Sequence, residues 1–257
     1  MTERVFNFAS LGSIVLGVSL PAGSVRVQVL DSLSAARVVV RTEDTAGPAA
    51  DAVNRTRSTQ TGQGFGIEVP ELPGNVMTQS VSGNRIVQNF GTVTGSVTGM
   101  TIINGRIVTG GASTMQVASP IEVTVSLPSG SCLAVVSQSA DAVVYGNLDR
   151  MEFRSVSGDL DVAGVRRLRA TTTSGDIRVH LVTEQISADS VSGDIEVDLY
   201  DGHQATLETT SGDIQARATR TASGRISASS VSGDVRLSDA RHLSVSATSV
   251  SGRVRNG

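Results

Sequence analysis

Five aspartates in this 257-residue chain recur in one sequence context and are the side chains most suited to a chemical role. Each follows Ser-Gly and precedes an aliphatic residue; the five are Asp159, Asp176, Asp194, Asp213 and Asp234. Carboxylate oxygens are the ligands that Ca²⁺ prefers, so carboxylates aligned along one edge of a fold would suit that ion. The Gly-Gly-x-Gly-x-Asp pattern of calcium-binding repeats is absent, however, and Ser-Gly-Asp favours tight turns. We therefore interpret the triplets as turns and predict no metal site.

Charged residues on the neighbouring predicted strands allow an enzymatic alternative. Arg178, Glu196 and Arg236 lie close in sequence to the aspartates, and parallel β-helices host polysaccharide lyases that use acidic and basic residues on one surface. Alternating charge is also what a solvated strand surface carries in any case. Fold alone is weak evidence of function, so we predict no catalytic residue and no enzymatic activity.

The remaining reactive residue types do not form a recognisable site. His180, His203 and His242 lie on separate repeats without metal-ligand spacing, and only one cysteine is present to join them. Cys132 follows a Gly-containing turn and has no evident histidine partner, so we expect a small apolar residue rather than a nucleophile. All 21 basic residues are arginine, which excludes lysine Schiff-base and P-loop chemistry. We predict no cofactor.

The Ser-Gly-Asp motif defines a repeat that must position these residues. Its serines lie at 157, 174, 192, 211 and 232, and a degenerate copy follows at 251, so the spacings are 17, 18, 19, 21 and 19 residues. A further degenerate copy is Ser223-Gly224-Arg225. Apolar and polar residues alternate on both sides of each copy, as half-buried strands require. No single unit can bury its apolar side alone, so the pattern predicts stacked rungs of a β-solenoid with about 17–21 residues per repeat.

Glycine is expected at each corner because it takes positive φ without penalty. The serine and aspartate side chains are expected to bond to nearby backbone groups and tighten the bend. We interpret the basic cluster 165–169 as a solvated loop between rungs. The low aromatic content, with no Trp and two Tyr, is consistent with a thin aliphatic core.

The rest of the chain predicts two further β regions. Residues 1–73 form an N-terminal β segment with an exposed loop at about 42–63, where no hydrophobic period is sustained. Residues 74–118 form a Gly-rich β insertion, with glycine at every fourth position in 91–99. Residues 119–257 form the solenoid, beginning with the alternating strand 120–128. The fold class is therefore all-β.

These features resemble a known bacterial family. The Ser-Gly-Asp-Ile/Val periodicity, preceded by an N-terminal β segment and a Val-x-Val-x-Leu-Pro strand, is similar to the β-strand-repeat proteins labelled "putative adhesin", a domain of unknown function. The resemblance covers 1–73 and 119–257, and 74–118 resembles an insertion. It implies a β-solenoid without catalytic residues. Arg225 and Arg253 depart from the Asp position, which makes a role shared by every copy doubtful.

The functional expectation is a non-catalytic structural or interaction scaffold that self-associates or binds a protein partner. One reason for this expectation is the final repeat. Its strand edges would carry unpaired backbone groups, which either another chain or the charges of Arg253 and Arg255 would have to protect from unwanted pairing. The alternative is a surface adhesin that binds a polymeric ligand, which requires export. With a net charge of −3 and no basic run, nucleic acid is not an expected partner. No membrane span is expected, and a first segment without net positive charge predicts a cytoplasmic location.

Overall fold

The structure is a computed structural model that describes residues 1–8, 11–73, 76–82, 85–90, 100–103, 106–109 and 116–257. Strands dominate it, and one short helix is present in the described part. The N-terminal elements are β1 (Thr2–Asn7), β2 (Val15–Leu30), β3 (Arg37–Thr42), α1 (Pro48–Asn54), β4 (Arg57–Thr61) and β5 (Gly64–Glu68). The next are β6 (Val76–Ser82), β7 (Arg85–Phe90), β8 (Met100–Ile103), β9 (Arg106–Thr109), β10 (Gln116–Ala118) and β11 (Glu122–Pro128).

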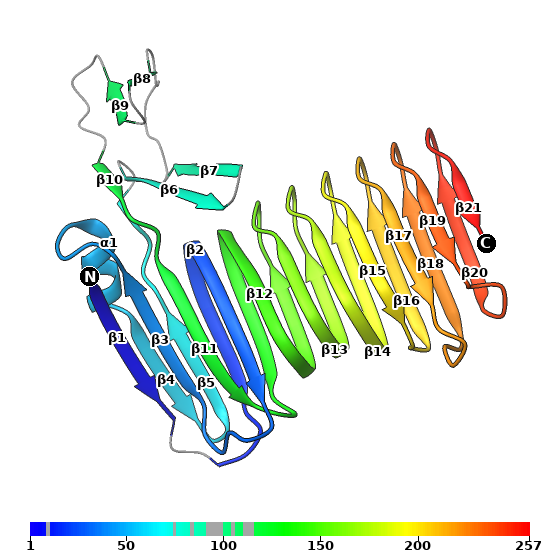
Figure 1. The fold of residues 1–257 in the computed structure, drawn as a ribbon, viewed down its shortest axis with the longest axis horizontal. Coiled ribbons are helices and arrows are strands. Elements are labelled where there is room, and N and C mark those ends of the chain that lie inside the picture. The colour runs from blue at the N-terminus through cyan, green and yellow to red at the C-terminus, as the bar shows by residue number, and fades with distance from the viewer. Residues whose placement is uncertain (9–10, 74–75, 83–84, 91–99, 104–105, 110–115) are drawn as a thin grey trace.

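The C-terminal half is a regular stack of strands (Figure 1). Its elements are β12 (Cys132–Arg154), β13 (Leu160–Thr171), β14 (Ile177–Ser190), β15 (Ile195–Tyr200), β16 (Gln204–Thr209), β17 (Ile214–Ala218), β18 (Arg225–Ser230), β19 (Val235–Ser238), β20 (Ser244–Ser249) and β21 (Val254–Asn256). All neighbours along this stack pair in parallel. The predicted solenoid is confirmed.

Each rung contributes one strand to each of two layers. Layer A contains β15, β17, β19 and β21 together with residues 142–144, 160–162 and 177–182 of the long strands. Layer B contains β16, β18 and β20 together with residues 150–154, 167–171 and 185–190. A Ser-Gly-Asp corner carries the chain from layer B of one rung to layer A of the next.

A thin aliphatic core lies between the layers. In layer A, Ile177, Ile195, Ile214 and Val235 are in register on consecutive rungs and are at most 1% exposed. Each such side chain contributes roughly 1.5–3 kcal/mol on burial. Because side chains alternate along a strand, a slip of one residue would turn the whole column to solvent, which fixes the register.

The N-terminal segment joins the same sheet through β2. This strand pairs in parallel with β5, β11 and β12, and β11 lies between β2 and β3. The predicted strand at 120–128 corresponds to β11.

The exposed loop predicted at about 42–63 is wrong in part. The structure places α1 and β4 there. The helix has Pro48 in its first turn, and its four apolar side chains are at most 1% exposed: Ala49, Ala50, Ala52 and Val53. The side chain of Arg4 donates to the carbonyl oxygens of Asn54, the last residue of the helix, and of Thr56, which follows it. A seven-residue helix is too short for sequence periodicity to reveal it.

Residues 76–118 contain β6 to β10, in which β6 pairs with β7 and β10 while β8 pairs with β9. The glycine-spaced run predicted in 91–99 lies outside the described residues. The division into segments 1–73, 74–118 and 119–257 stays a prediction.

Candidate functional site

The sequence predicted that the corner glycines adopt positive φ. The structure shows instead that glycine is required there because the backbones of adjacent rungs approach closely. A Cβ on Gly175, Gly193, Gly212 or Gly233 would lie 1.8–2.0 Å from the carbonyl oxygen of the corner glycine one rung earlier. None of these four has positive φ. Such a distance is far inside van der Waals contact, so any side chain would push the rungs apart.

A column of hydroxyl side chains, which the sequence analysis did not single out, supports these corners. In each copy a Ser or Thr lies three residues before the glycine and accepts a hydrogen bond from its N–H: Ser155, Thr172, Ser190, Thr209, Ser230 and Ser249, at 2.8–3.2 Å. Ser230 also donates to the Gly212 carbonyl oxygen at 3.0 Å and is 2% exposed. The full motif is therefore Ser/Thr-x-Ser-Gly-Asp, and this spacing is visible in the sequence.

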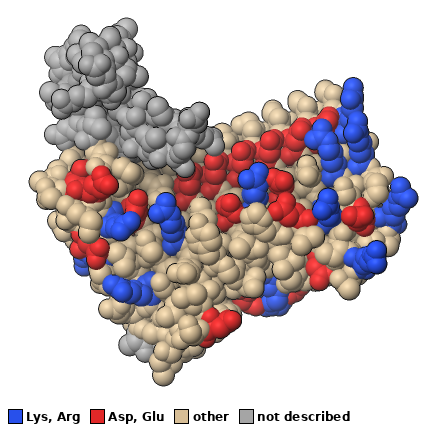
Figure 2. Space-filling view, viewed as in Figure 1, with Lys and Arg blue, Asp and Glu red and all other residues tan. Residues whose placement is uncertain are grey.

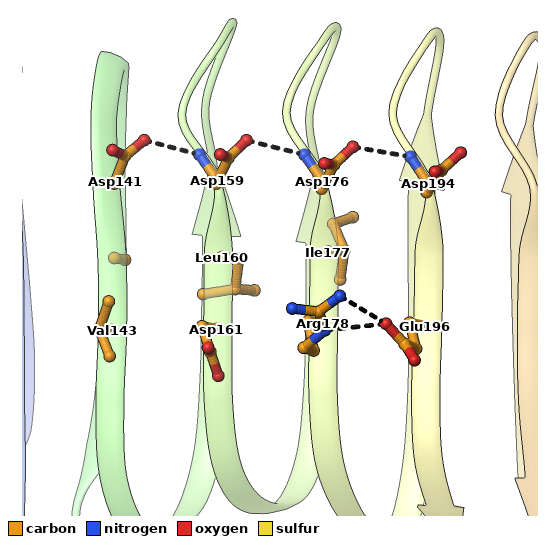
Figure 3. Close-up of a pocket in the computed structure, with 11 residues that line it drawn as sticks. Asp141, Val143, Asp159, Leu160, Asp161, Asp176, Ile177, Arg178, Asp194 and Glu196 are labelled. Atoms are coloured by element: carbon orange, nitrogen blue, oxygen red, sulfur yellow. Dashed lines mark hydrogen bonds and ion pairs between the residues drawn. The ribbon is translucent and has the colours of Figure 1, made fainter. Parts of the chain in front are cut away.

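The aspartates form a ladder along the same edge (Figure 3). The Oδ1 atom of each accepts a hydrogen bond from the backbone N–H of the next one: Asp141 to Asp159, Asp159 to Asp176, Asp176 to Asp194, Asp194 to Asp213 and Asp213 to Asp234, at 2.7–3.0 Å. The predicted local turn bond is thus replaced by a bond between rungs. Asp141 extends the ladder although it lacks the Ser-Gly motif.

The ladder ends at Arg253, whose backbone N–H donates to Asp234 Oδ1 at 2.9 Å. This bond, and the nearby guanidinium groups of Arg236, Arg253 and Arg255, lower the pKa of Asp234. The triplet at Ser223-Gly224-Arg225 is not a ladder corner. Gly224 has a φ of 76° and lies at the opposite end of the rung, where the N–H of Arg225 donates to the carbonyl oxygen of His203.

Beside the ladder, the outer surface of layer A contains a hollow with a volume of about 370 Å³. Asp194, Arg178 and Glu196, considered above for lyase chemistry, line this hollow together with other ladder aspartates. Arg178 is bound to Glu196, with its Nη2 atom 2.7 Å from Glu196 Oε2 (Figure 3). Arg236 lies three rungs from Arg178 and binds Asp213 and Asp234 instead. The hollow is therefore a shallow charged surface whose arginine is already paired.

His180 lies on the same surface between two carboxylates from adjacent rungs. Its Nδ1 atom is 2.6 Å from Asp198 Oδ2 and its Nε2 atom is 3.2 Å from Asp161 Oδ1. The carboxylates lie on opposite sides of the ring and do not converge on one point. His203 and His242 are elsewhere, and His242 Nε2 is 3.2 Å from the carbonyl oxygen of Ala222. Among the described residues no cluster of three or more candidate ligands is arranged for a metal.

Cys132 lies near a second group of charges, at the opposite end of the rungs from the Ser-Gly-Asp corners. Burial, followed by the nearby Asp149, raises the pKa of its thiol, which disfavours the nucleophilic thiolate. The basic cluster at 165–169 is part of β13 and not a loop. There Arg166 binds Asp149 and Glu184, and Arg167 binds Glu184 at 2.7 Å. These arginines lower the pKa of Glu184, with the Arg167 hydrogen bond as the largest cause.

The chain matches a protein-family model over most of its length. The model described as Toastrack DUF4097 matches residues 54–256. The chain belongs to this family. The match also spans 74–118, which the sequence analysis had treated as an insertion. No curated protein matches the Toastrack chain significantly.

The chain is also similar to solved structures of bacterial proteins. A "putative adhesin" from Bacteroides fragilis has 13% identity and a TM-score of 0.53, covering 100% of the Toastrack chain and 97% of its own. A "putative adhesin" from Parabacteroides distasonis has 10% identity and a TM-score of 0.48, covering 100% and 96%. A "putative lipid binding protein" from the same species has 12% identity and a TM-score of 0.42, covering 99% and 97%. The first of these likenesses supports the fold.

No helix in the described part of the Toastrack chain is long and apolar enough to cross a membrane.

Proposed function

We propose that this protein is a rigid, non-catalytic interaction scaffold that self-associates. The observation that carries the proposal is the ladder: the recurring aspartates, together with the hydroxyls of Thr209, Ser230 and Ser249, could have done chemistry but bond one rung to the next. Chemistry would need a carboxylate and a base that converge on a substrate. The corner side chains instead form a continuous column of hydrogen bonds that stiffens the stack.

A direct test of the non-catalytic role is an activity screen on intact protein. Purified chain is incubated with a panel of polyuronides, and unsaturated products are followed by ultraviolet absorbance. The scaffold role predicts no turnover above a buffer control. Turnover that disappears in Arg178→Ala and Asp194→Ala, while both variants stay folded by circular dichroism, would overturn it.

Self-association is supported by the rung formed by β20 and β21. Val254 is 43% exposed, whereas Val235, its partner one rung earlier, is 0% exposed. An aliphatic side chain that is this exposed favours contact with another chain. Light scattering at low and high salt measures this, and a monomer in both conditions would end the self-association part of the proposal.

A second candidate is adhesion to a polymeric surface ligand, which the name of the Bacteroides fragilis neighbour favours. It requires export, whereas our proposal places the protein in the cytoplasm. Cell fractionation followed by mass spectrometry separates the two. Intact protein that begins at Met1 and is confined to the cytoplasmic fraction supports the scaffold, and a processed form at the cell surface supports adhesion.

A further inference from the structure

The outer surface of layer A changes its charge along the stack. Over β12 to β15 it carries seven carboxylates against one arginine, Arg178: Asp141, Asp159, Asp161, Asp176, Asp194, Glu196 and Asp198. Over β17 to β21 it carries four arginines, Arg217, Arg236, Arg253 and Arg255, against Asp213 and Asp234, with Asp239 in the following loop. Figure 2 shows acidic side chains along the middle of the stack and arginines gathered towards its C-terminal end.

Ion pairs within the chain do not remove this separation between an acidic part and a basic part of the surface. Arg236 binds both Asp213 and Asp234, and Arg217 lies 3.8 Å from Asp239, so each of these three carboxylates has an arginine partner. Arg253 and Arg255 make no ion pair with any described residue, and both are exposed. At the other end, Asp194 and Asp176 accept backbone hydrogen bonds but make no ion pair in the described part of the chain. They line the hollow of about 370 Å³.

We propose that the outer surface of layer A binds the same surface of a second copy of this chain, with the two stacks antiparallel. The inference rests on the self-association proposed above and names the surface and geometry. The two-fold axis lies in the interface, parallel to the strands and near β15 and β17. Arg253 and Arg255 of one copy then lie over the acidic part of the other, where Asp161 of β13 occupies the same register position as Arg255.

Charge decides between the possible orientations. A two-fold axis parallel to the strands reverses the order of the rungs, so the acidic part of each copy faces the basic part of the other. An axis along the stack would place carboxylates on carboxylates and arginines on arginines, which is repulsive. A two-fold contact of this kind is closed, so the product is a dimer and not a filament.

The size of the surface predicts a weak and salt-sensitive dimer. Seven strands at roughly 4.8 Å spacing and about four residues at roughly 3.3 Å give a flat area on the order of 500 Å² per copy. Standard interfaces bury about 800 Å² per partner. Exposed ion pairs are also screened, with a Debye length that falls from roughly 30 Å at about 0.01 M salt to roughly 3 Å at about 1 M.

Two charge-reversal variants test the geometry. The first, Asp161→Arg with Asp198→Arg, replaces two carboxylates of the acidic part with arginines and leaves the aspartate ladder intact. The second, Arg253→Glu with Arg255→Glu, replaces two arginines of the basic part with carboxylates. A control, Glu208→Arg with Arg225→Glu, makes matched changes on exposed residues of layer B. Circular dichroism and thermal melting confirm that each variant is folded.

Sedimentation velocity at about 0.01 M and about 1 M salt measures the dimer. We expect wild type and the control to dimerise at low salt and to dissociate at high salt. Each reversal variant alone should lose at least tenfold in dimer affinity, and an equimolar mixture of the two should restore the dimer. Wild-type association that both reversal variants retain, or a mixture that stays monomeric, would overturn the proposed surface and leave self-association standing. A wild type that is monomeric at low salt would overturn both.

Discussion

At the residue scale, the absence of a side chain at the corner glycines decides whether the rungs can stack. Gly193 has no room for a Cβ, because the carbonyl oxygen of Gly175 lies 1.9 Å from the position it would take. The hydroxyl of Ser190 then accepts the hydrogen bond of the glycine N–H at 2.9 Å. The corner is therefore fixed by contact between backbones first and by side-chain hydrogen bonds second.

We predict that Gly193→Ala destabilises the protein by about 2–3 kcal/mol, since the added methyl group must separate two hydrogen-bonded rungs. Urea unfolding followed by circular dichroism measures the change. Gly17→Ala is the matched control, because the nearest atom to its Cβ is the Phe65 carbonyl oxygen at an ordinary 3.7 Å. The control should stay within ~0.5 kcal/mol of wild type. Equal effects of the two substitutions would refute the close-approach argument.

Ser230→Ala should cost about 1–3 kcal/mol, because it leaves the buried N–H of Gly233 and carbonyl oxygen of Gly212 without their side-chain partner. Ser232→Ala removes the exposed serine of the same corner and should change stability by less than ~0.5 kcal/mol. Unfolding free energies of the two variants, measured side by side, check the contrast. If the exposed serine mattered more, the corner assignment would be wrong.

Tyr200→Phe should leave stability unchanged or raise it by up to about 1 kcal/mol. The Tyr200 hydroxyl is buried and finds no hydrogen-bond partner in the described structure, so its removal relieves a desolvation cost. Burial also raises the pKa of Tyr200 to about 12 from an ordinary 10.0. Wild-type stability should thus fall as pH rises from about 10 to about 12, and part of that fall should be absent from the variant in alkaline melting curves. Matching alkaline curves for both proteins would contradict this.

At the scale of elements, strands β13 and β14 are held together by ion pairs as well as by backbone pairing. Glu184 of β14 binds Arg166 and Arg167 of β13. The sequence alone does not reveal these ion pairs, because they depend on the register shift between Val165 and Arg167 within β13, where a loop was predicted.

Glu184→Gln should reduce the acid sensitivity of the fold. The arginines lower the pKa of Glu184 in the folded state, so its contribution is present above its unfolded pKa, near 4.5, and is lost as pH falls through the folded pKa. Melting temperatures recorded between about pH 6 and pH 3 should fall less steeply for the variant than for wild type. Asp201 and Asp234, whose pKa values are also lowered, contribute to the slope that remains. An unchanged slope would exclude the ion pair as a contributor.

The repeat itself was predictable, because alternation and the spacing of Ser-Gly-Asp report directly on strand and corner. The hydroxyl column was also visible in the sequence, three residues before each glycine. The hydrogen-bond partner of each aspartate was not predictable from the sequence. Asp176, for example, accepts a hydrogen bond from an N–H 18 residues away, which only the stacked geometry reveals. Helix α1 escaped prediction because its seven residues are too few for a helical period.

At the scale of the whole molecule, the two layers form a stack whose outer layer A surface carries many charged side chains (Figures 1 and 2). The ladder and the hydroxyl column lie along one edge of the stack, and the separated charges lie on layer A. The scaffold role and the dimer geometry both require that successive rungs stay in register, because a shifted rung would break the ladder and mix the charges.

Short-range thiol crosslinking tests that register most directly, in a Cys132→Ser background. Thr206 and Ser227 are in register on neighbouring layer B strands, and Ser187 is in register with Thr206 one rung earlier. A crosslinker that spans about 5 Å should join Thr206→Cys to Ser227→Cys, which lie one strand spacing apart, and should not join Ser187→Cys to Ser227→Cys, about twice as far apart. Peptide mapping of the monomeric product should therefore find only the first link. Equal yields of both, or a link only in the second pair, would contradict the stacked architecture.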